Sequence, residues 1–443
     1  MSALARYFHL KGLCVAGYDR TPSVITDALK KEGIQVIFSE EENLIDSVYR
    51  NSVTTLVVYT PAVEASHKQL VFFRNYKFRV LKRSQVLGLI TTGSNAVCVA
   101  GTHGKTTIST LTTHLFTQSK MGCTAFLGGI SKNYSTNFLW NGNSPFVVLE
   151  ADEFDRSFLT LSPHSALVSS VDSDHLDIYE NRENLLSAFK AFGKRVVDGG
   201  ILLVKKGLPV NWDLNHEVKI YSYALQDESD FYATNIKISN KTYTFNLVTP
   251  KGILENLQMG IPGLLNVENA VGACALALLN GVTEAEIRQA LPSFTGISRR
   301  FEVHIDTPEL VYIDDYAHHP EEIRATLMSI RALYPNHYLV GIFQPHLFSR
   351  TRDFAKEFSE SLSELDELFL LDIYPAREQP IDGVTSEIII KEVKNIPARL
   401  CSKDELVDLL TPRLPQVVVT MGAGDIDREV ESVKLKLSSF LNK

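Results

Sequence analysis

Residues 96–107 read Ala-Val-Cys-Val-Ala-Gly-Thr-His-Gly-Lys-Thr-Thr, and this stretch decides how the middle of the chain folds. Its apolar first half predicts a buried strand, and the spacing of Ile108, Leu111 and Leu115 after it predicts a helix. A glycine-framed turn between a strand and a helix presents backbone N–H groups, a lysine ammonium and a hydroxyl to nucleotide phosphates. The stretch therefore predicts a phosphate-binding loop.

The loop is shorter than the general template, which has a glycine five residues before its second glycine; that position is Val99 here. The loop reads Gly101-Thr102-His103-Gly104-Lys105-Thr106 and is followed by Thr107. A surface helix that happens to start with Gly-Lys-Thr is the alternative. The strand before the loop and the helix after it favour nucleotide binding. Lys105 is expected on the β and γ phosphates and Thr106 on Mg²⁺.

The composition is that of an ordinary folded protein. The 443 residues suggest about three domains, and 44% of them are apolar and 22% charged. The net charge of −8 argues against a nucleic-acid-binding protein. The five cysteines are scattered without a Cys-x-x-Cys pair, and the apolar runs are too short to cross a bilayer. Since the sequence shows no charged-then-apolar leader, we expect a cytoplasmic protein without membrane insertion.

Polar side chains follow the apolar runs throughout the sequence. The runs are 97–100, 146–149, 167–170, 310–313, 338–343 and 417–420, and helical patterns separate them. This alternation predicts an α/β fold with parallel sheets, in which ligands bind beyond the carboxyl ends of the strands. The chain is therefore expected to be an enzyme. Breaks at 91–95, which is expected to be a linker, and at 294–298 divide it into units 1–92, 93–297 and 298–443.

Acidic residues after the second and third runs offer metal ligands. Glu150 ends its run and is the best candidate for a Mg²⁺ ligand besides Thr106, because this ion prefers oxygen. His175 binds a second metal or orients a water, unless its segment is only a charge-paired turn. The phosphate loop in the same unit favours the metal. The acids around His175 are Asp172, Asp174 and Asp177. Three further acids either support the metal ligands from behind, cap a nearby helix or face solvent, and the last two roles are favoured: Asp152, Glu153 and Asp155.

Two further pairs of residues have both a binding and a structural interpretation. Asn266 and Asn269 open an alanine-rich helical pattern; their amides match an adenine edge, and a helix N-cap is the alternative. His346 and Arg350 follow a strand and suit an anionic substrate group, unless Arg350 pairs with Glu357.

The third unit also carries candidates for nucleotide binding. Arg300 and Asp315 could clamp a ribose or a phosphate, with Tyr316 stacking on the ligand. His318 and His319 belong either to this site or only to the start of the helix that the following proline begins.

Taken together, these motifs resemble the Mur ligases of peptidoglycan synthesis. The resemblance extends from Met1 to the C-terminal region, and the motifs occur in the family's order. They are Gly101-Thr-His-Gly-Lys-Thr-Thr107, Glu150-Ala-Asp-Glu153, Asp174-His175-Leu-Asp-Ile-Tyr179, Asp314-Asp-Tyr-Ala-His-His-Pro320, Phe343-Gln-Pro-His346, Ser349-Arg-Thr351 and Gly422-Ala-Gly-Asp425. The resemblance implies a Rossmann-like sugar-nucleotide domain, a central P-loop ATPase domain and a C-terminal Rossmann-like α/β domain.

The resemblance also implies a reaction and the residues that perform it. The nearest branch of the family joins L-alanine to the lactyl carboxylate of UDP-N-acetylmuramate through an acyl phosphate, with ATP and Mg²⁺. The implied ATP-binding residues are Gly101, Thr102, His103, Gly104, Lys105, Thr106, Thr107, Asn266, Asn269, Arg300, Asp315 and Tyr316. The implied metal ligands are Thr106, Glu150 and His175, and the implied catalytic residues are Lys105, His175, His318 and Arg350. The implied substrate contacts are Asp19, Thr60, Ala62, His346 and Arg350. A monomer or a homodimer without a nucleic-acid partner is expected.

Two features depart from the family pattern. Many members carry a basic residue where this chain has Leu347, which shifts anion binding to His346 and Arg350. The family also begins with a strand and a glycine-rich turn that lead into the segment starting here at Met1. The first domain is therefore expected to lack its first strand and glycine loop, and to leave backbone groups unpaired at a sheet edge.

The sequence also allows other functions. A recycling ligase that joins a whole tripeptide to the same sugar nucleotide is the alternative within the family, but the Phe-Gln-Pro-His and Arg-Thr segments favour the alanine-adding branch. Folylpolyglutamate synthetase fits the motifs less well. An incomplete first domain suggests a non-catalytic nucleotide-binding protein, against which Lys105, Glu150 and His175 count. A Rossmann dehydrogenase would need a complete Gly-x-Gly-x-x-Gly after a strand, which the sequence lacks.

Overall fold

The computed structural model describes residues 1–172, 176–214, 217–376 and 378–441. The chain forms two compact units. The first comprises residues 1–235, 245–257 and 268–294, and the second comprises residues 236–244, 258–267 and 295–443. The break expected at 294–298 thus coincides with a boundary between the units.

The stretch 91–95, expected as a linker, has regular structure instead. Helix α4 (Arg83–Thr92) ends there and strand β5 (Asn95–Ala100) begins. Thr91 is buried; its hydroxyl donates to a backbone carbonyl one turn earlier (2.8 Å) and accepts from the N–H of Ser162 (3.1 Å). The polar residues of this stretch therefore satisfy backbone groups in the interior rather than forming a solvated connection.

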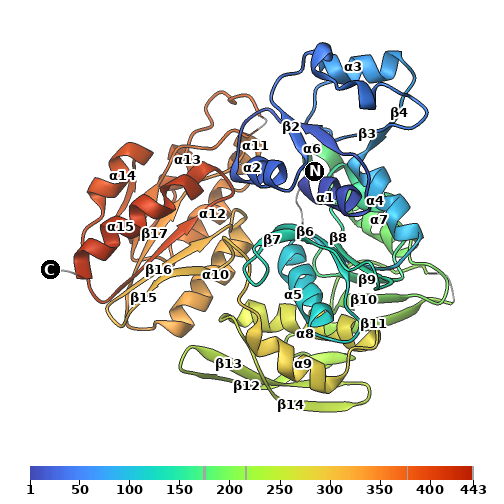
Figure 1. Cartoon of the computed structure of the whole chain (residues 1–443). Coiled ribbons are helices and arrows are strands. Elements are labelled where there is room, and N and C mark those ends of the chain that lie inside the picture. The colour runs from blue at the N-terminus through green and yellow to red at the C-terminus, as the bar shows by residue number, and fades with distance from the viewer. Residues whose placement is uncertain (173–175, 215–216, 377, 442–443) are drawn as a thin grey trace. The chain divides into compact units, whose positions relative to one another are not determined.

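The first 92 residues contain four short strands in two separate sheets. Strand β1 (Ala16–Tyr18) pairs with β2 (Gln35–Ile37), and β3 (Leu56–Tyr59) pairs with β4 (Arg79–Lys82), both in parallel. Figure 1 shows β3 and β4 beside helix α3 (Lys68–Asn75). Within the described ranges β1 and β3 each have a single strand partner. Two more helices complete this region: α1 (Ser2–Leu10) and α2 (Val24–Lys31).

A ten-stranded sheet carries the phosphate loop. Its strand order is β14-β13-β12-β11-β10-β9-β5-β8-β6-β7. Strand β5 lies between β8 (Phe146–Glu150) and β9 (Ser165–Val168), and both pairs are parallel. The carboxyl ends of these three strands therefore meet at one edge, as predicted. Strand β9 ends two residues earlier than the apolar run 167–170 indicated, so Ser169 and Ser170 lie beyond it.

Helix α5 (Lys105–Thr117) follows the loop and packs on this sheet (Figure 1). Its predicted apolar residues Ile108, Leu111 and Leu115 are fully buried, and so are all the β5 residues after Asn95. Because both elements are covered on all sides, the turn between them is held in a fixed position.

The second unit is built on a six-stranded sheet with the order β15-β16-β20-β17-β18-β19. Strand β15 (Glu302–Asp306) is antiparallel to its neighbour, and the other pairs are parallel. Alternate strand residues contribute to two separate hydrophobic cores, one on each face. Helices α10 (Pro320–Leu333), α12 (Ala355–Leu362) and α13 (Glu387–Ile390) cover one face, and α14 (Lys403–Leu409) and α15 (Val430–Leu441) cover the other (Figure 1). This is the predicted α/β arrangement.

The remaining strands belong to the ten-stranded and the six-stranded sheet. The other strands are β6 (Thr124–Ser131), β7 (Thr136–Leu139), β10 (Ile201–Lys205), β11 (Lys219–Ala224), β12 (Phe231–Ser239), β13 (Thr242–Thr249), β14 (Gly252–Gln258), β16 (Leu310–Asp315), β17 (Tyr338–Phe343), β18 (Glu367–Leu370), β19 (Ala398–Leu400) and β20 (Gln416–Met421). The other α-helices are α6 (Leu176–Tyr179), α7 (Arg182–Gly193), α8 (Leu264–Leu279), α9 (Glu284–Ala290) and α11 (Phe348–Asp353). Short 3-10 helices span Glu42–Leu44, Ser47–Tyr49, Phe154–Thr160, Leu291–Ser293 and Asp425–Glu429. Of the helices described, none has both the length and the apolar character needed to cross a membrane.

Candidate active site

The loop between β5 and α5 depends on two glycines. Gly101 has φ +137° and Gly104 has φ +81°, both in the region that favours glycine. A Cβ on Gly101 would come within 2.1 Å of the Ser169 hydroxyl oxygen. Gly104 is the N-cap of α5, so the N–H groups of the first turn, including those of Lys105 and Thr106, are open to an anion.

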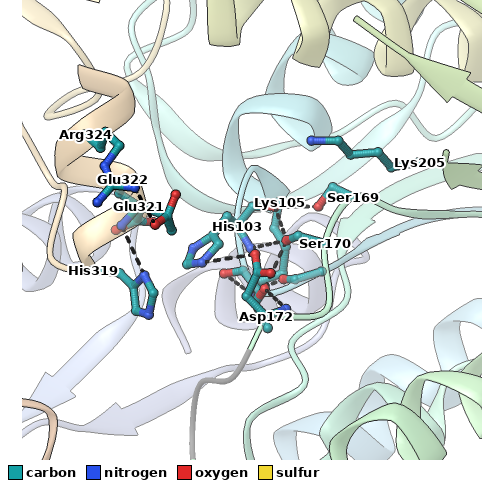
Figure 2. Close-up of polar contacts among 12 residues, drawn as sticks. His103, Lys105, Ser169, Ser170, Asp172, Lys205, His319, Glu321, Glu322 and Arg324 are labelled. Atoms are coloured by element: carbon teal, nitrogen blue, oxygen red, sulfur yellow. Dashed lines mark hydrogen bonds and ion pairs between the residues drawn. The ribbon is translucent and has the colours of Figure 1, made fainter. Parts of the chain in front are cut away.

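Two serines after β9 hold the loop in shape, as Figure 2 shows. The Ser170 hydroxyl oxygen accepts from the His103 N–H (2.7 Å) and from the Thr102 hydroxyl (3.0 Å). The Ser169 hydroxyl donates to the carbonyl oxygens of Ala100 (3.2 Å) and His103. The sequence analysis did not identify either serine; their place directly after the strand next to β5 was the available signal.

The His103 ring lies beside an acidic side chain. Its Nε2 is 3.7 Å from a carboxylate oxygen of Asp172, and the Asp172 N–H donates to the Thr102 hydroxyl oxygen (3.1 Å). The segment that follows Asp172 includes Asp174 and His175. His175 is the residue expected to be both a metal ligand and a catalytic residue. Asp174 and His175 both lie outside the described residues.

The ammonium of Lys105 lies inside the loop. It donates to the carbonyl oxygen of Gly101 (2.6 Å) and forms an ion pair with Glu153 (2.8 Å). Burial opposes the charge of the Lys105 ammonium, but the carboxylates of Glu153, Glu150 and Asp152 outweigh burial and raise its pKa above the ordinary value. Lys105 therefore carries its positive charge at neutral pH.

The expectation that Glu153 faces solvent or caps a helix is wrong. Its side chain is 0% exposed and pairs with the Lys105 ammonium. The same expectation holds for Asp152 and Asp155, which lie at the surface. Asp155 pairs with Lys82 (3.1 Å), and Asp152 accepts from a nearby backbone N–H (3.1 Å).

Glu150 ends β8 at the same sheet edge as the loop. Its carboxylate packs against Gly128 of β6, where a Cβ would come within 2.1 Å of an oxygen. Thr106 is in the first turn of α5. A carboxylate and a hydroxyl offer the hard oxygen ligands that Mg²⁺ prefers, so these residues fit the ion. Among the residues that the structure describes, no three His, Cys, Asp or Glu side chains gather as a metal site, and His175 is not among them.

The two asparagines of α8 have different surroundings. The helix begins at Leu264, so neither Asn266 nor Asn269 is its N-cap residue, which removes that alternative. The Asn266 amide donates to the carbonyl oxygen of Pro262 (2.6 Å). The Asn269 side chain is buried, and its amide oxygen is 3.0 Å from the position of a Cβ on Gly104. Asn269 thus lies against the phosphate loop.

In the second unit, the predicted clamp residues lie together. The Arg300 guanidinium is 4.9 Å from the ring centroid of Tyr316. The Asp315 carboxylate accepts from the N–H groups of Phe301 (2.9 Å) and Ala317 (2.8 Å). Burial raises the pKa of Asp315 to about 6, against the lowering effects of Arg300 and these two donors.

His318, His346 and Arg350 also lie together. The rings of His318 and His346 are 6.1 Å apart, and an Arg350 nitrogen is 3.4 Å from His346 Nδ1. His319 has the structural role that was its alternative, since it is the N-cap of α10 and accepts from the Glu321 N–H (3.4 Å, Figure 2). Leu347, which stands where many family members carry a basic residue, is buried and has φ +72°. Because its side chain is apolar, this position contributes no charge.

The expected sugar-nucleotide residues follow strands of the first region. Asp19 comes directly after β1, where its carboxylate accepts from the N–H of Thr21 (3.3 Å) and its own N–H donates to Ile37 (3.1 Å). Thr60 follows β3, and Ala62 is exposed in the loop after it. All three lie beyond the carboxyl ends of parallel strands, where ligands bind in such sheets.

Comparisons with known proteins match nearly the whole chain. The model of the Mur ligase family catalytic domain matches residues 1–94, that of the Mur ligase middle domain matches 99–277, and that of the Mur ligase glutamate ligase domain matches 299–424. The chain is 50% identical over 434 residues to the UDP-N-acetylmuramate–L-alanine ligase of Phocaeicola vulgatus, covering 98% of this chain and 94% of that one. It is 51% identical over 442 residues to the corresponding ligase of Porphyromonas gingivalis, covering 99% and 97%.

Solved structures share the fold. The UDP-N-acetylmuramate–alanine ligase of Thermotoga maritima matches with a TM-score of 0.82 at 25% identity, covering 99% of this chain and 97% of that one. A murein peptide ligase from Psychrobacter arcticus matches with a TM-score of 0.66 at 20% identity, covering 98% and 95%.

Proposed function

Because the chain belongs to the Mur ligase family, we propose that it joins L-alanine to the lactyl carboxylate of UDP-N-acetylmuramate and converts ATP to ADP and phosphate. One observation carries the chemistry. The buried Lys105 ammonium lies in a left-handed glycine loop, and Glu150 ends the parallel strand next to that loop. This arrangement suits phosphoryl transfer, in which crowded negative charge must be stabilised.

The proposed reaction has two steps. A carboxylate oxygen attacks the γ-phosphorus of ATP, the bond to the β-phosphate oxygen breaks, and ADP leaves. The amine of L-alanine then attacks the acyl carbon, the amide forms, and phosphate and a proton leave. Lys105 and the N–H groups of the loop bind the phosphates during the first step. Thr106, Glu150 and His175 are the residues that would hold Mg²⁺, which would add positive charge beside the phosphates.

The other predicted residues take binding roles in this proposal. Asn269 and Asn266 bind the adenine, and Arg300, Asp315 and Tyr316 hold the rest of the nucleotide. His318, His346 and Arg350 bind the reacting carboxyl group and the amino acid. Asp19, Thr60 and Ala62 bind the UDP group. A cytoplasmic location fits these substrates.

The test is phosphate release by the purified chain with Mg²⁺, ATP and UDP-N-acetylmuramate. We expect release only when L-alanine is also present, together with a product heavier than UDP-N-acetylmuramate by one alanine residue. D-alanine is the matched control, and a tripeptide tests the recycling alternative. Preference for the tripeptide would assign the recycling reaction instead, and no release with any acceptor would favour the non-catalytic alternative.

A further inference from the structure

We propose that Glu153 is a positioning residue for Lys105, whose carboxylate fixes the direction of the ammonium so that one N–H faces the nucleotide phosphates. This inference rests on the proposed function. It gives a role to a residue for which the sequence favoured solvent or a helix cap over a supporting role in the site.

The contact between the two side chains is close and largely shielded from solvent. The Lys105 nitrogen is 2.9 Å from one Glu153 carboxylate oxygen and 2.8 Å from the other. The Glu153 side chain is 0% exposed and that of Lys105 is 13% exposed. A buried carboxylate needs a cation and hydrogen bonds to be retained, and here Lys105 provides both.

The hydrogen bonds of the ammonium leave one N–H for a ligand. A lysine ammonium has three N–H donors. The Gly101 carbonyl oxygen takes one at 2.6 Å, and the Glu153 carboxylate takes a second. The contact that remains, to the Thr102 carbonyl oxygen, is long at 3.4 Å. The third N–H can therefore turn to a phosphate while the first two hold the nitrogen in place.

The backbone around Glu153 is shaped to bury this one carboxylate. Its carbonyl oxygen accepts from the hydroxyl of Tyr179 (2.6 Å), a fully buried residue of α6, and from the Arg156 N–H (2.9 Å). Asp155 and Arg156 follow with backbone φ angles of +52° and +54°, which residues other than glycine rarely adopt. This turn directs Glu153 inward, whereas Asp155 remains at the surface with Lys82.

The experiment compares Glu153→Gln and Glu153→Ala with Asp155→Asn as a matched control. Glutamine keeps the size and an acceptor oxygen but loses the charge. We expect kcat for ligation to fall on the order of 10- to 100-fold in Glu153→Gln and further in Glu153→Ala, because small misplacements of a catalytic group are costly. The KM for ATP should stay within about threefold in Glu153→Gln, because the loop N–H groups still bind the phosphates. Asp155→Asn should match the wild type.

A purely structural role would lower the melting temperature without this split between kcat and KM. Wild-type kcat in both folded Glu153 variants would overturn the proposal. If neither variant folds, Tyr179→Phe decides, since it removes only the hydroxyl that fixes the Glu153 backbone. A several-fold lower kcat at unchanged KM supports the proposal, and an unchanged kcat overturns it. The wild type run in parallel separates the two hypotheses: no ligation by the wild type refutes the proposed function and the role of Glu153 with it.

Discussion

Lys105 is the residue on which the site depends, because its ammonium is buried among carboxylates. The ammonium stays protonated in this buried position because the nearby carboxylates raise its pKa by more than burial lowers it. Its neighbours differ in their surroundings: Glu153 is fully buried, whereas Asp152 and Asp155 are at the surface. Replacing any member of the Lys105–Glu153 pair therefore affects stability as well as catalysis.

We expect Lys105→Met to abolish ATP turnover and to lower the free energy of unfolding by about 3 kcal/mol, because it removes the ammonium that pairs with the buried Glu153 carboxylate. Denaturant unfolding measures the second effect. The double variant Lys105→Met/Glu153→Gln should recover much of this stability while remaining inactive. A double variant whose losses simply add would show that the two residues do not interact.

Asp315 predicts a pH dependence of stability. Its pKa of about 6 in the folded chain lies above the ordinary value of 3.8, so its contribution to stability is present below pH 4 and is lost as the pH rises through about 6. Relative to Asp315→Asn, the wild type should lose up to about 3 kcal/mol of unfolding free energy between pH 4 and 7. Denaturant unfolding of both proteins across this range measures the difference. Parallel pH profiles would contradict the assignment.

At the scale of elements, the site is made by the turn between β5 and α5 and by the two strands that flank β5. The parallel pairing with β8 and β9 brings Glu150, Ser169 and Ser170 to one sheet edge. Gly101 stands where Ser169 and Ser170, just beyond β9, leave no room for a side chain, and this fixes the shape of the loop.

Gly101→Ala should disrupt the loop. The added Cβ would meet the Ser169 hydroxyl at 2.1 Å, and φ +137° is strained for alanine. We expect ATP affinity to fall at least tenfold and the melting temperature to fall, measured with a fluorescent ATP analogue and by thermal unfolding. Gly93→Ala is the control, because nothing lies within 4 Å of its Cβ position.

Gly128→Ala tests the role of Glu150 without changing that residue. The Cβ would come within 2.1 Å of its carboxylate oxygen, so the carboxylate must move. We expect the Mg²⁺ concentration for half-maximal ligation to rise about tenfold, since coordination depends on ligand position. An unchanged Mg²⁺ dependence would remove Glu150 from the metal site.

At the scale of the whole molecule, the sequence predicted the parts that follow from local patterns. The apolar runs became strands and the glycine loop lies between a strand and a helix, because periodicity and turn chemistry act over a few residues. It did not predict the burial of Glu153 or the contacts of Ser169 and Ser170 with the loop. These depend on which strands become neighbours and on the turn at Asp155, which no local pattern expresses.

The same distinction explains the stretch 91–95. Its Thr-Thr-Gly-Ser-Asn composition is typical of a linker, but Thr91 is buried because its hydroxyl satisfies backbone groups of neighbouring segments. In the second unit, the sequence left both a structural and a binding role open for His319. The structure gives it the N-cap of α10, because the following proline begins that helix.

In the proposed reaction, a phosphoryl group passes from ATP to the carboxylate of the sugar nucleotide before the amide forms. The most direct measurement uses UDP-N-acetylmuramate labelled with ¹⁸O in both lactyl carboxylate oxygens, with ATP, Mg²⁺ and L-alanine, and mass analysis of the phosphate released. We expect one ¹⁸O atom in each phosphate, because the attacking carboxylate oxygen leaves with it. Amide formation accompanied by unlabelled phosphate would show that no acyl phosphate forms.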